Sequence, residues 1–138
     1  MTRLRAFVVC VTACCLFVLS MPIAAEIIPT GEYECAGINY ATQEKLTSKA
    51  YLHIQGCMLK VHWVIQQEKN HHYHSLLNPI SSTVFAGAVR NKARDDVGTE
   101  KMVFSPDYKE ANLTFFTYNR TMHKKNYGKA SCKKIDLG

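Results

Sequence analysis

A two-residue alternation of apolar and polar side chains is clearest between Tyr51 and Gln67. Leu52 and Ile54 share one face of an extended segment, and a second alternating run follows Gly56. The apolar positions of that second run are Leu59, Val61, Trp63 and Ile65. Period two is typical of a β-strand, and a glycine between two such runs accepts the positive φ of a tight turn. The segment therefore predicts a β-hairpin.

The chain on either side of this hairpin also divides into short β-rich segments. We expect extended segments at 31–37, 71–77, 81–90, 99–105, 111–118 and 126–135. Residues 39–48 are polar and residues 91–98 are charged, so both predict connections. Gly87 falls inside an expected strand, which indicates a bulge or a close backbone approach. No stretch of a dozen residues after the first 25 has a helical apolar stripe.

These short segments predict an all-β fold, a small antiparallel up-and-down β-barrel of about eight strands. A β-sandwich of the immunoglobulin type is the alternative. That fold expects a tryptophan about a dozen residues after the first cysteine. Here Trp63 lies 28 residues beyond Cys35, so the barrel is preferred.

The first 25 residues have the pattern of a secretory signal peptide. Arg3 and Arg5 precede an uncharged apolar run that ends in Ala24 and Ala25. The run is long enough to be a retained membrane anchor, but Pro22 interrupts its end and favours cleavage. We expect a signal peptide over residues 1–25, a single domain over residues 26–138, and a periplasmic or secreted product with no stable membrane span after cleavage.

Three cysteines, Cys35, Cys57 and Cys132, remain after that cleavage. Export places them where disulfides persist. We expect a bond between Cys35 and Cys132, because the first and last strands become neighbours if the sheet closes. A shorter link from Cys35 to Cys57 is the alternative. The preferred pairing leaves Cys57 as a free, inert thiol.

Short motifs near the two ends of the expected domain bracket the all-β span: YEC at 33–35 and SCK at 131–133. This frame resembles that of the periplasmic lysozyme-inhibitor barrels of the MliC type, in which a Y-x-C opening segment and a late cysteine enclose a small antiparallel barrel. The resemblance covers the two ends and the length. Residues 81–87 depart from the family's inhibitory loop. The resemblance implies a Gram-negative host and an inhibitor-like role.

Aromatic residues supply the first candidate binding groups. Trp63 is the only tryptophan, and its place on an apolar face predicts a core anchor, with ligand stacking at a barrel mouth as the alternative. Binding of a partner protein predicts exposed rings among Tyr73, Phe85 and Tyr118. Basic residues gather in the last twenty positions, with Lys124 and Lys125 at their centre.

The mature chain is basic. The signal peptide holds two of the 17 basic residues and none of the 11 acidic residues, so the mature net charge is 15 − 11 = +4. A basic patch fits an anionic partner such as an envelope or host surface, although lysines also solvate and protect strand edges. Export makes nucleic acid an unexpected partner.

Titratable residues outside this patch form a histidine cluster and an acidic cluster. In an extended His71–His74 segment, His72 and His74 share one face and His71 points away. These two imidazoles are the candidate metal ligands, but a site needs more than two. The acidic residues Asp95, Asp96 and Glu100 are predicted to lie in a salt-bridged loop with nothing apolar nearby to raise a carboxyl pKa.

No nucleophile, metal-hydrolase or phosphate-binding motif is present, so we expect neither an enzyme nor a cofactor. The sequence predicts an exported barrel that works by binding. One hypothesis is a protein-binding or inhibitor-like module that acts on an envelope or host factor and is related to host association or virulence. The alternative is a carrier of a small apolar or anionic ligand, which requires a cavity of roughly 300 Å³ or more.

Overall fold

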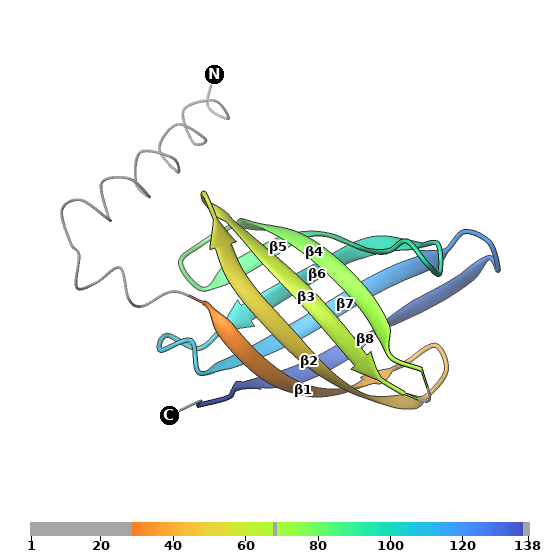
Figure 1. Ribbon diagram of the computed structural model, residues 1–138, viewed down its shortest axis with the longest axis horizontal. Helices are drawn as coiled ribbons and strands as arrows, with labels where there is room; N and C mark the ends of the chain where they lie inside the picture. The colour runs from red at the N-terminus through yellow and green to blue at the C-terminus, as the bar shows by residue number, and fades with distance from the viewer. Residues whose placement is uncertain (1–28, 68, 137–138) are drawn as a thin grey trace, which may run out of the picture.

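The computed structural model describes residues 29–67 and 69–136, which form a closed antiparallel β-barrel (Figure 1). The strands are β1 (Gly31–Asn39), β2 (Glu44–Gln55), β3 (Met58–Gln66), β4 (His71–Pro79), β5 (Val84–Asn91), β6 (Asp96–Phe104), β7 (Glu110–Asn119) and β8 (Lys124–Lys134). The predicted signal peptide lies outside the described residues. Within them there is no helix whose length and apolar character would let it cross a membrane.

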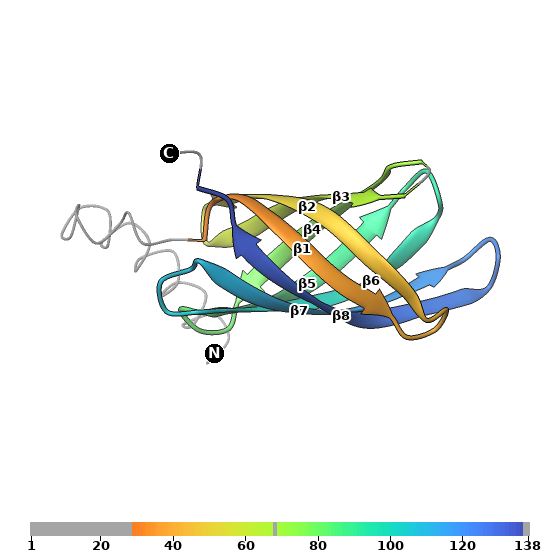
Figure 2. The same ribbon diagram turned by 90° about the horizontal axis from the view of Figure 1, so that it is seen from below.

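Each strand pairs with the next, and β8 pairs with β1 to close the barrel. The fold is therefore the predicted up-and-down barrel and not the alternative sandwich. The start of β1 and the end of β8 lie together at one end of the molecule (Figure 2). Closure leaves no unpaired sheet edge along these two strands.

A disulfide reinforces the closing pair of strands. Cys35 and Cys132 are directly opposite each other in the β1–β8 register and are joined by a disulfide, as predicted. Both are almost completely buried.

Cys57, at the turn between β2 and β3, is also disulfide-bonded, so the expectation of a free thiol at that position is wrong.

The central hairpin is confirmed as β2 and β3. Gln55 pairs with Met58, which leaves a two-residue turn whose Gly56 has a φ of 63°. The turn chemistry and the period-two pattern act together here, which is why the sequence predicts this register well. The two expected connections, 39–48 and 91–98, do contain turns, at 40–43 and 92–95, but their expected lengths are wrong, because the rest of each segment is strand.

The polar composition of these two segments suggests long loops. In the structure each segment forms a four-residue turn, and the polar residues after the turn belong to the next strand. Asn39, Asn91 and Asn119 end β1, β5 and β7, and each accepts a hydrogen bond from a backbone N–H two or three residues later. The fourth residue of each turn has a positive φ (Gln43, Asp95 and His123). The same asparagine-started turn is therefore used three times at one end of the barrel.

Glycines allow neighbouring strands to approach closely. A Cβ added at Gly98 would lie 1.9 Å from the Phe116 carbonyl oxygen, and one at Gly87 would lie 2.2 Å from the Leu76 carbonyl oxygen. Only glycine permits these approaches. The predicted close backbone approach at Gly87 is confirmed.

The interior is filled unequally along the barrel axis. At the end that holds the start of β1 and the end of β8, which we call the closed end, aromatic rings pack edge to face: Phe104 contacts Tyr33, Phe85 and Tyr108 at centroid distances between 5.7 and 6.1 Å. The Tyr33 hydroxyl donates to the Tyr108 carbonyl oxygen. Burial raises the pKa of Tyr33 to about 12. This end is a packed core.

Candidate ligand-binding site in the barrel interior

The opposite end of the barrel, which we call the open end, contains a cavity of about 260 Å³. Its lining includes residues of the connections after β1, β3, β5 and β7. These connections lie together at one end of the barrel (Figure 1). Its apolar walls include Leu46, Ile65, Val89, Leu113, Phe115 and Met122. Its polar lining toward the connections includes Thr42, Glu44, Gln67, Arg94, Lys124 and Asn126. All eight strands thus contribute residues to the cavity lining, and the residue from β6 carries a carboxyl group.

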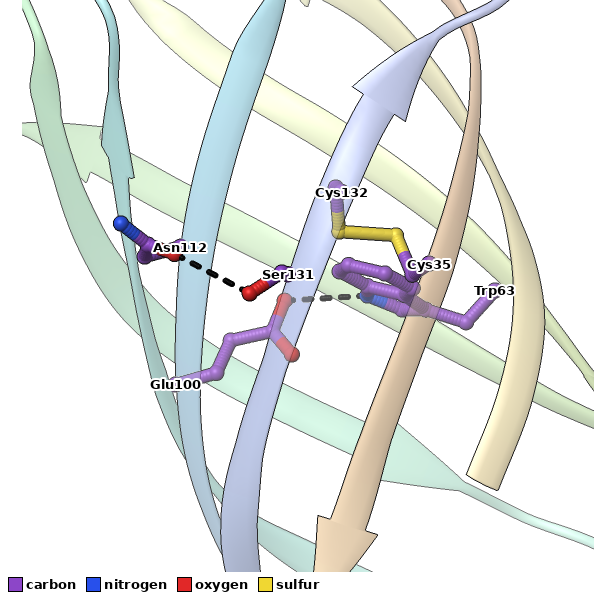
Figure 3. Close-up of a disulfide and its surroundings, with 6 residues drawn as sticks. All are labelled: Cys35, Trp63, Glu100, Asn112, Ser131 and Cys132. Atoms are coloured by element: carbon purple, nitrogen blue, oxygen red, sulfur yellow. Dashed lines mark hydrogen bonds between the residues drawn. A yellow bond between two sulfur atoms is a disulfide. The ribbon is translucent and has the colours of Figure 1, made fainter. Parts of the chain in front are cut away.

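That carboxyl group belongs to Glu100, which forms a hydrogen-bonded cluster with Trp63 and Ser75. The Trp63 indole N–H donates to Glu100 Oε1 at 3.1 Å and to Ser75 Oγ at 2.9 Å. The Ser75 hydroxyl hydrogen-bonds to Glu100 in turn. Figure 3 shows the Trp63–Glu100 bond crossing the interior beside the disulfide. Trp63 and Glu100 both line the cavity, so the cluster forms part of its wall.

Glu100 is buried in a way that changes its ionisation. Glu100 is only 6% exposed. Burial raises the pKa of the Glu100 carboxyl to about 7, and the hydrogen bonds from Ser75 and Trp63 offset part of that rise by stabilising the charged form. Near neutral pH the cavity therefore contains a carboxyl group that is divided between its neutral and charged forms.

A second polar network supports the open end. Asp96 is 1% exposed and accepts hydrogen bonds from the Tyr73 hydroxyl at 2.5 Å and from Asn119 Nδ2 at 2.7 Å. Arg94 Nε lies 3.6 Å from the same carboxylate. Burial, followed by the bond to Asp96, raises the pKa of Tyr73, which stays neutral. The negative charge of Asp96 is thus stabilised by three protein groups: the Tyr73 hydroxyl, the Asn119 amide and the Arg94 guanidinium.

The turns around the cavity are tied to one another. Asn119 Nδ2 also donates to the Arg94 carbonyl oxygen at 2.7 Å, and Arg120 forms an ion pair with Asp95 at 2.6 Å. The turn after β1 joins β8 through Asn39 Nδ2, which donates to Asn126 Oδ1 at 2.9 Å. These bonds hold the rim in a defined shape before any ligand arrives.

The structure separates the candidate binding residues into three groups. Trp63, Tyr73 and Lys124 line the cavity. Phe85 is buried in the aromatic core of the closed end, so its expected exposure is wrong. Tyr118 and Lys125 pair across β7 and β8 and lie away from the cavity lining, with Lys125 exposed. Trp63 is buried in the core, as expected, and it also borders the cavity. Stacking of a ligand on Trp63 stays a prediction.

The histidines of β4 alternate as predicted. His71 lines the cavity, whereas His72 and His74 are on the outer surface. There His62 of β3 stacks on His74 at a centroid distance of 4.7 Å, and His62 Nε2 lies 2.9 Å from His72 Nδ1. In the part of the chain that the structure describes, no group of three or more His, Cys, Asp or Glu side chains has the arrangement of a metal site.

Glu100, Ser75 and Asp96 are the important site residues that the sequence interpretation missed. Asp96 and Glu100 were expected in a solvated loop, and that expectation is wrong: both are buried on β6. Asp95 forms an ion pair with Arg120 of the β7–β8 turn, and Asp96 pairs with Arg94, which belongs to the expected charged loop. A signal for Glu100 was present, since it shares the period-two face of Met102 and Phe104. Its charge argued for the surface, and the tertiary structure overrides that argument.

Comparison with known proteins identifies the fold. No family model and no curated protein sequence matches the chain. A redesigned β-barrel matches with a TM-score of 0.65 and 8% identity over 82% of this chain and 96% of that one. Two further structures, EF1p2_mFAP2b bound to DFHBI and the redesigned β-barrel mFAP1 bound to DFHBI, give TM-scores of 0.63 and 0.59. The first of these two structures is 6% identical to this chain, and the match covers 83% of this chain and 99% of that one. The second is 9% identical, and the match covers 78% of this chain and 96% of that one. This chain is thus similar in fold to small closed β-barrels.

Proposed function

We propose that this protein binds a small, largely apolar ligand in the cavity at the open end of its barrel. The observation that carries the proposal is the unequal filling of the interior: one end is packed with aromatic rings and the other holds a cavity of about 260 Å³. Ligand sites are typically apolar with a few polar groups that orient the ligand. The apolar walls and the Trp63–Ser75–Glu100 cluster have that composition.

The size of the cavity limits the ligand. Its volume is slightly below the value expected for a carrier and near the lower end of the range for ligand pockets. The two similar barrels bound to DFHBI support the idea that a barrel of this build accommodates a small molecule. At their low identity they carry no information about which one.

The proposal includes an exported location, periplasmic or secreted. The Cys35–Cys132 disulfide supports this location, since such bonds persist in oxidising compartments. An inhibitor-like or other protein-binding role, with its relation to host association, stays a prediction from the sequence. For a basic lysozyme it faces an obstacle, because the mature charge of +4 would repel a partner of the same sign.

Native mass spectrometry of the exported protein tests ligand binding. We expect a retained adduct that disappears under denaturing conditions. Leu46→Trp places a large side chain in the cavity and should greatly reduce the adduct. Thr47→Trp adds the same side chain to the neighbouring exposed position and should leave it unchanged. Equal occupancy in the two variants would contradict the proposed site.

A further inference from the structure

Glu100 differs from the other buried carboxylate in lacking a cationic partner. The ion pairs within residues 29–67 and 69–136 involve Glu32, Asp95 and Asp96, and none involves Glu100. Asp96, by contrast, has Arg94 beside it and two further donors. A buried carboxylate without a counter-ion is costly, so a protein normally pairs it or leaves it neutral.

The Glu100 carboxyl also has unused hydrogen-bonding capacity. An ionised carboxylate offers about four acceptor positions. The described donors to Glu100 are the Trp63 indole and the Ser75 hydroxyl. Because Glu100 lines the cavity, its remaining acceptor positions are available to a molecule that enters there. The structure thus provides a carboxyl group, two donors that orient it and an adjoining cavity, and none of the ion pairs of the described residues neutralises Glu100.

We infer that the cavity binds an amphipathic amine, whose ammonium group pairs with Glu100 while its apolar body lies against Ile65, Leu113 and Phe115. This inference rests on the proposed function, since it assigns a chemical class to the ligand of the same cavity. An ammonium group donates up to three hydrogen bonds and supplies the missing counter-charge. An anionic ligand would place a second negative charge beside the first, and a neutral ligand would leave the carboxylate uncompensated.

The other titratable groups that face the cavity do not provide this charge. They are Glu44 of β2, His71 and Tyr73 of β4, Arg94 of the β5–β6 turn and Lys124 of β8. Arg94 is already paired with Asp96. Lys124 is exposed to solvent, where salt weakens its repulsion of a cationic ligand. Burial, together with the neighbouring Arg94, lowers the pKa of His71, so this histidine is largely neutral near pH 7.

Matched amine and alcohol probes test the inference on the full mature protein. We would use 2-phenylethylamine, 2-(2-naphthyl)ethylamine and hexylamine, each beside the alcohol of the same shape, with calorimetry as the readout. We expect the amines to bind at least about tenfold more tightly than the alcohols at pH 8. Amine affinity should rise about tenfold between pH 6 and pH 8, because Glu100 must lose its proton to form the pair.

Glu100→Gln should remove both the amine preference and its pH dependence. Glu34→Gln, at an exposed position on β1, is the matched control and should keep both. Carboxyl NMR adds a second readout, in which a bound amine should lower the pKa of Glu100. Alcohols that bind as tightly as amines would overturn the inference and leave the proposed function intact. Failure of every probe pair to bind would overturn both.

Discussion

The pH dependence of stability should reveal the buried carboxyl of Glu100 directly. Below a pH of about 4.5 this group is protonated in both the folded and the unfolded chain. As the pH rises, the unfolded chain loses the proton first, whereas folded Glu100 keeps it until the pH reaches about 7. The folded state binds more protons in this window, so the free energy of unfolding falls as the pH rises.

The size of the effect follows from the two pKa values. Moving from 4.5 to about 7 at about 1.4 kcal/mol per pH unit gives about 3 kcal/mol, which is fully lost above pH 7. Glu100→Gln keeps a carbonyl oxygen for the Trp63 indole but has no charge to bury. We therefore expect this variant to gain stability relative to the wild-type protein by about 3 kcal/mol between pH 4 and pH 8.

Urea denaturation, followed by the fluorescence of Trp63, measures this difference at each pH, since Trp63 is the only tryptophan. The comparison between variants cancels the contributions of other groups, such as Asp95 and Asp107, whose lowered pKa values act in the opposite direction. Glu34→Gln should follow the wild-type protein. Parallel curves for wild type and Glu100→Gln across this range would refute the assignment of Glu100 as a buried, perturbed carboxyl.

Three further predictions concern the barrel frame. Replacing Cys35 and Cys132 by alanine should lower the free energy of unfolding by about 4–5 kcal/mol, because their bond joins residues 97 apart in sequence; an unchanged denaturation midpoint would contradict this. Gly98→Ala should cost more than about 2 kcal/mol, since the new Cβ would overlap backbone atoms of β7; thermal unfolding with no loss of Tm would count against the close packing. Tyr73→Phe should cost about 1–3 kcal/mol by removing a donor to buried Asp96, and hydrogen exchange should increase at the open end; unchanged exchange there would show that this bond does not support the rim.

The barrel could be predicted because several local signals agree. Gly56, between two alternating runs, sets the register of β2 and β3 together with the period-two pattern. The expected closure of the sheet then favours the bond between Cys35 in the first strand and Cys132 in the last strand. The starts of β2 and β6 were placed less well, because the asparagine-started turns before them have the composition of long loops but occupy only four residues. Composition reports polarity, whereas strand boundaries depend on hydrogen bonds to distant strands.

The sequence by itself determined the strand content and the central hairpin, since these depend on period-two patterning and on turns between neighbours in the chain. The pairing of Cys35 with Cys132 followed only from the expected closure of the sheet, because it joins the first and last strands. Only the tertiary structure decided where the interior is filled and where it is hollow. That outcome depends on which inward residues of eight strands meet at the same level: aromatic rings at one end, and Trp63, Ser75 and Glu100 beside a cavity at the other. No short stretch of sequence contains those neighbours, because β3, β4 and β6 bring them together from across the barrel.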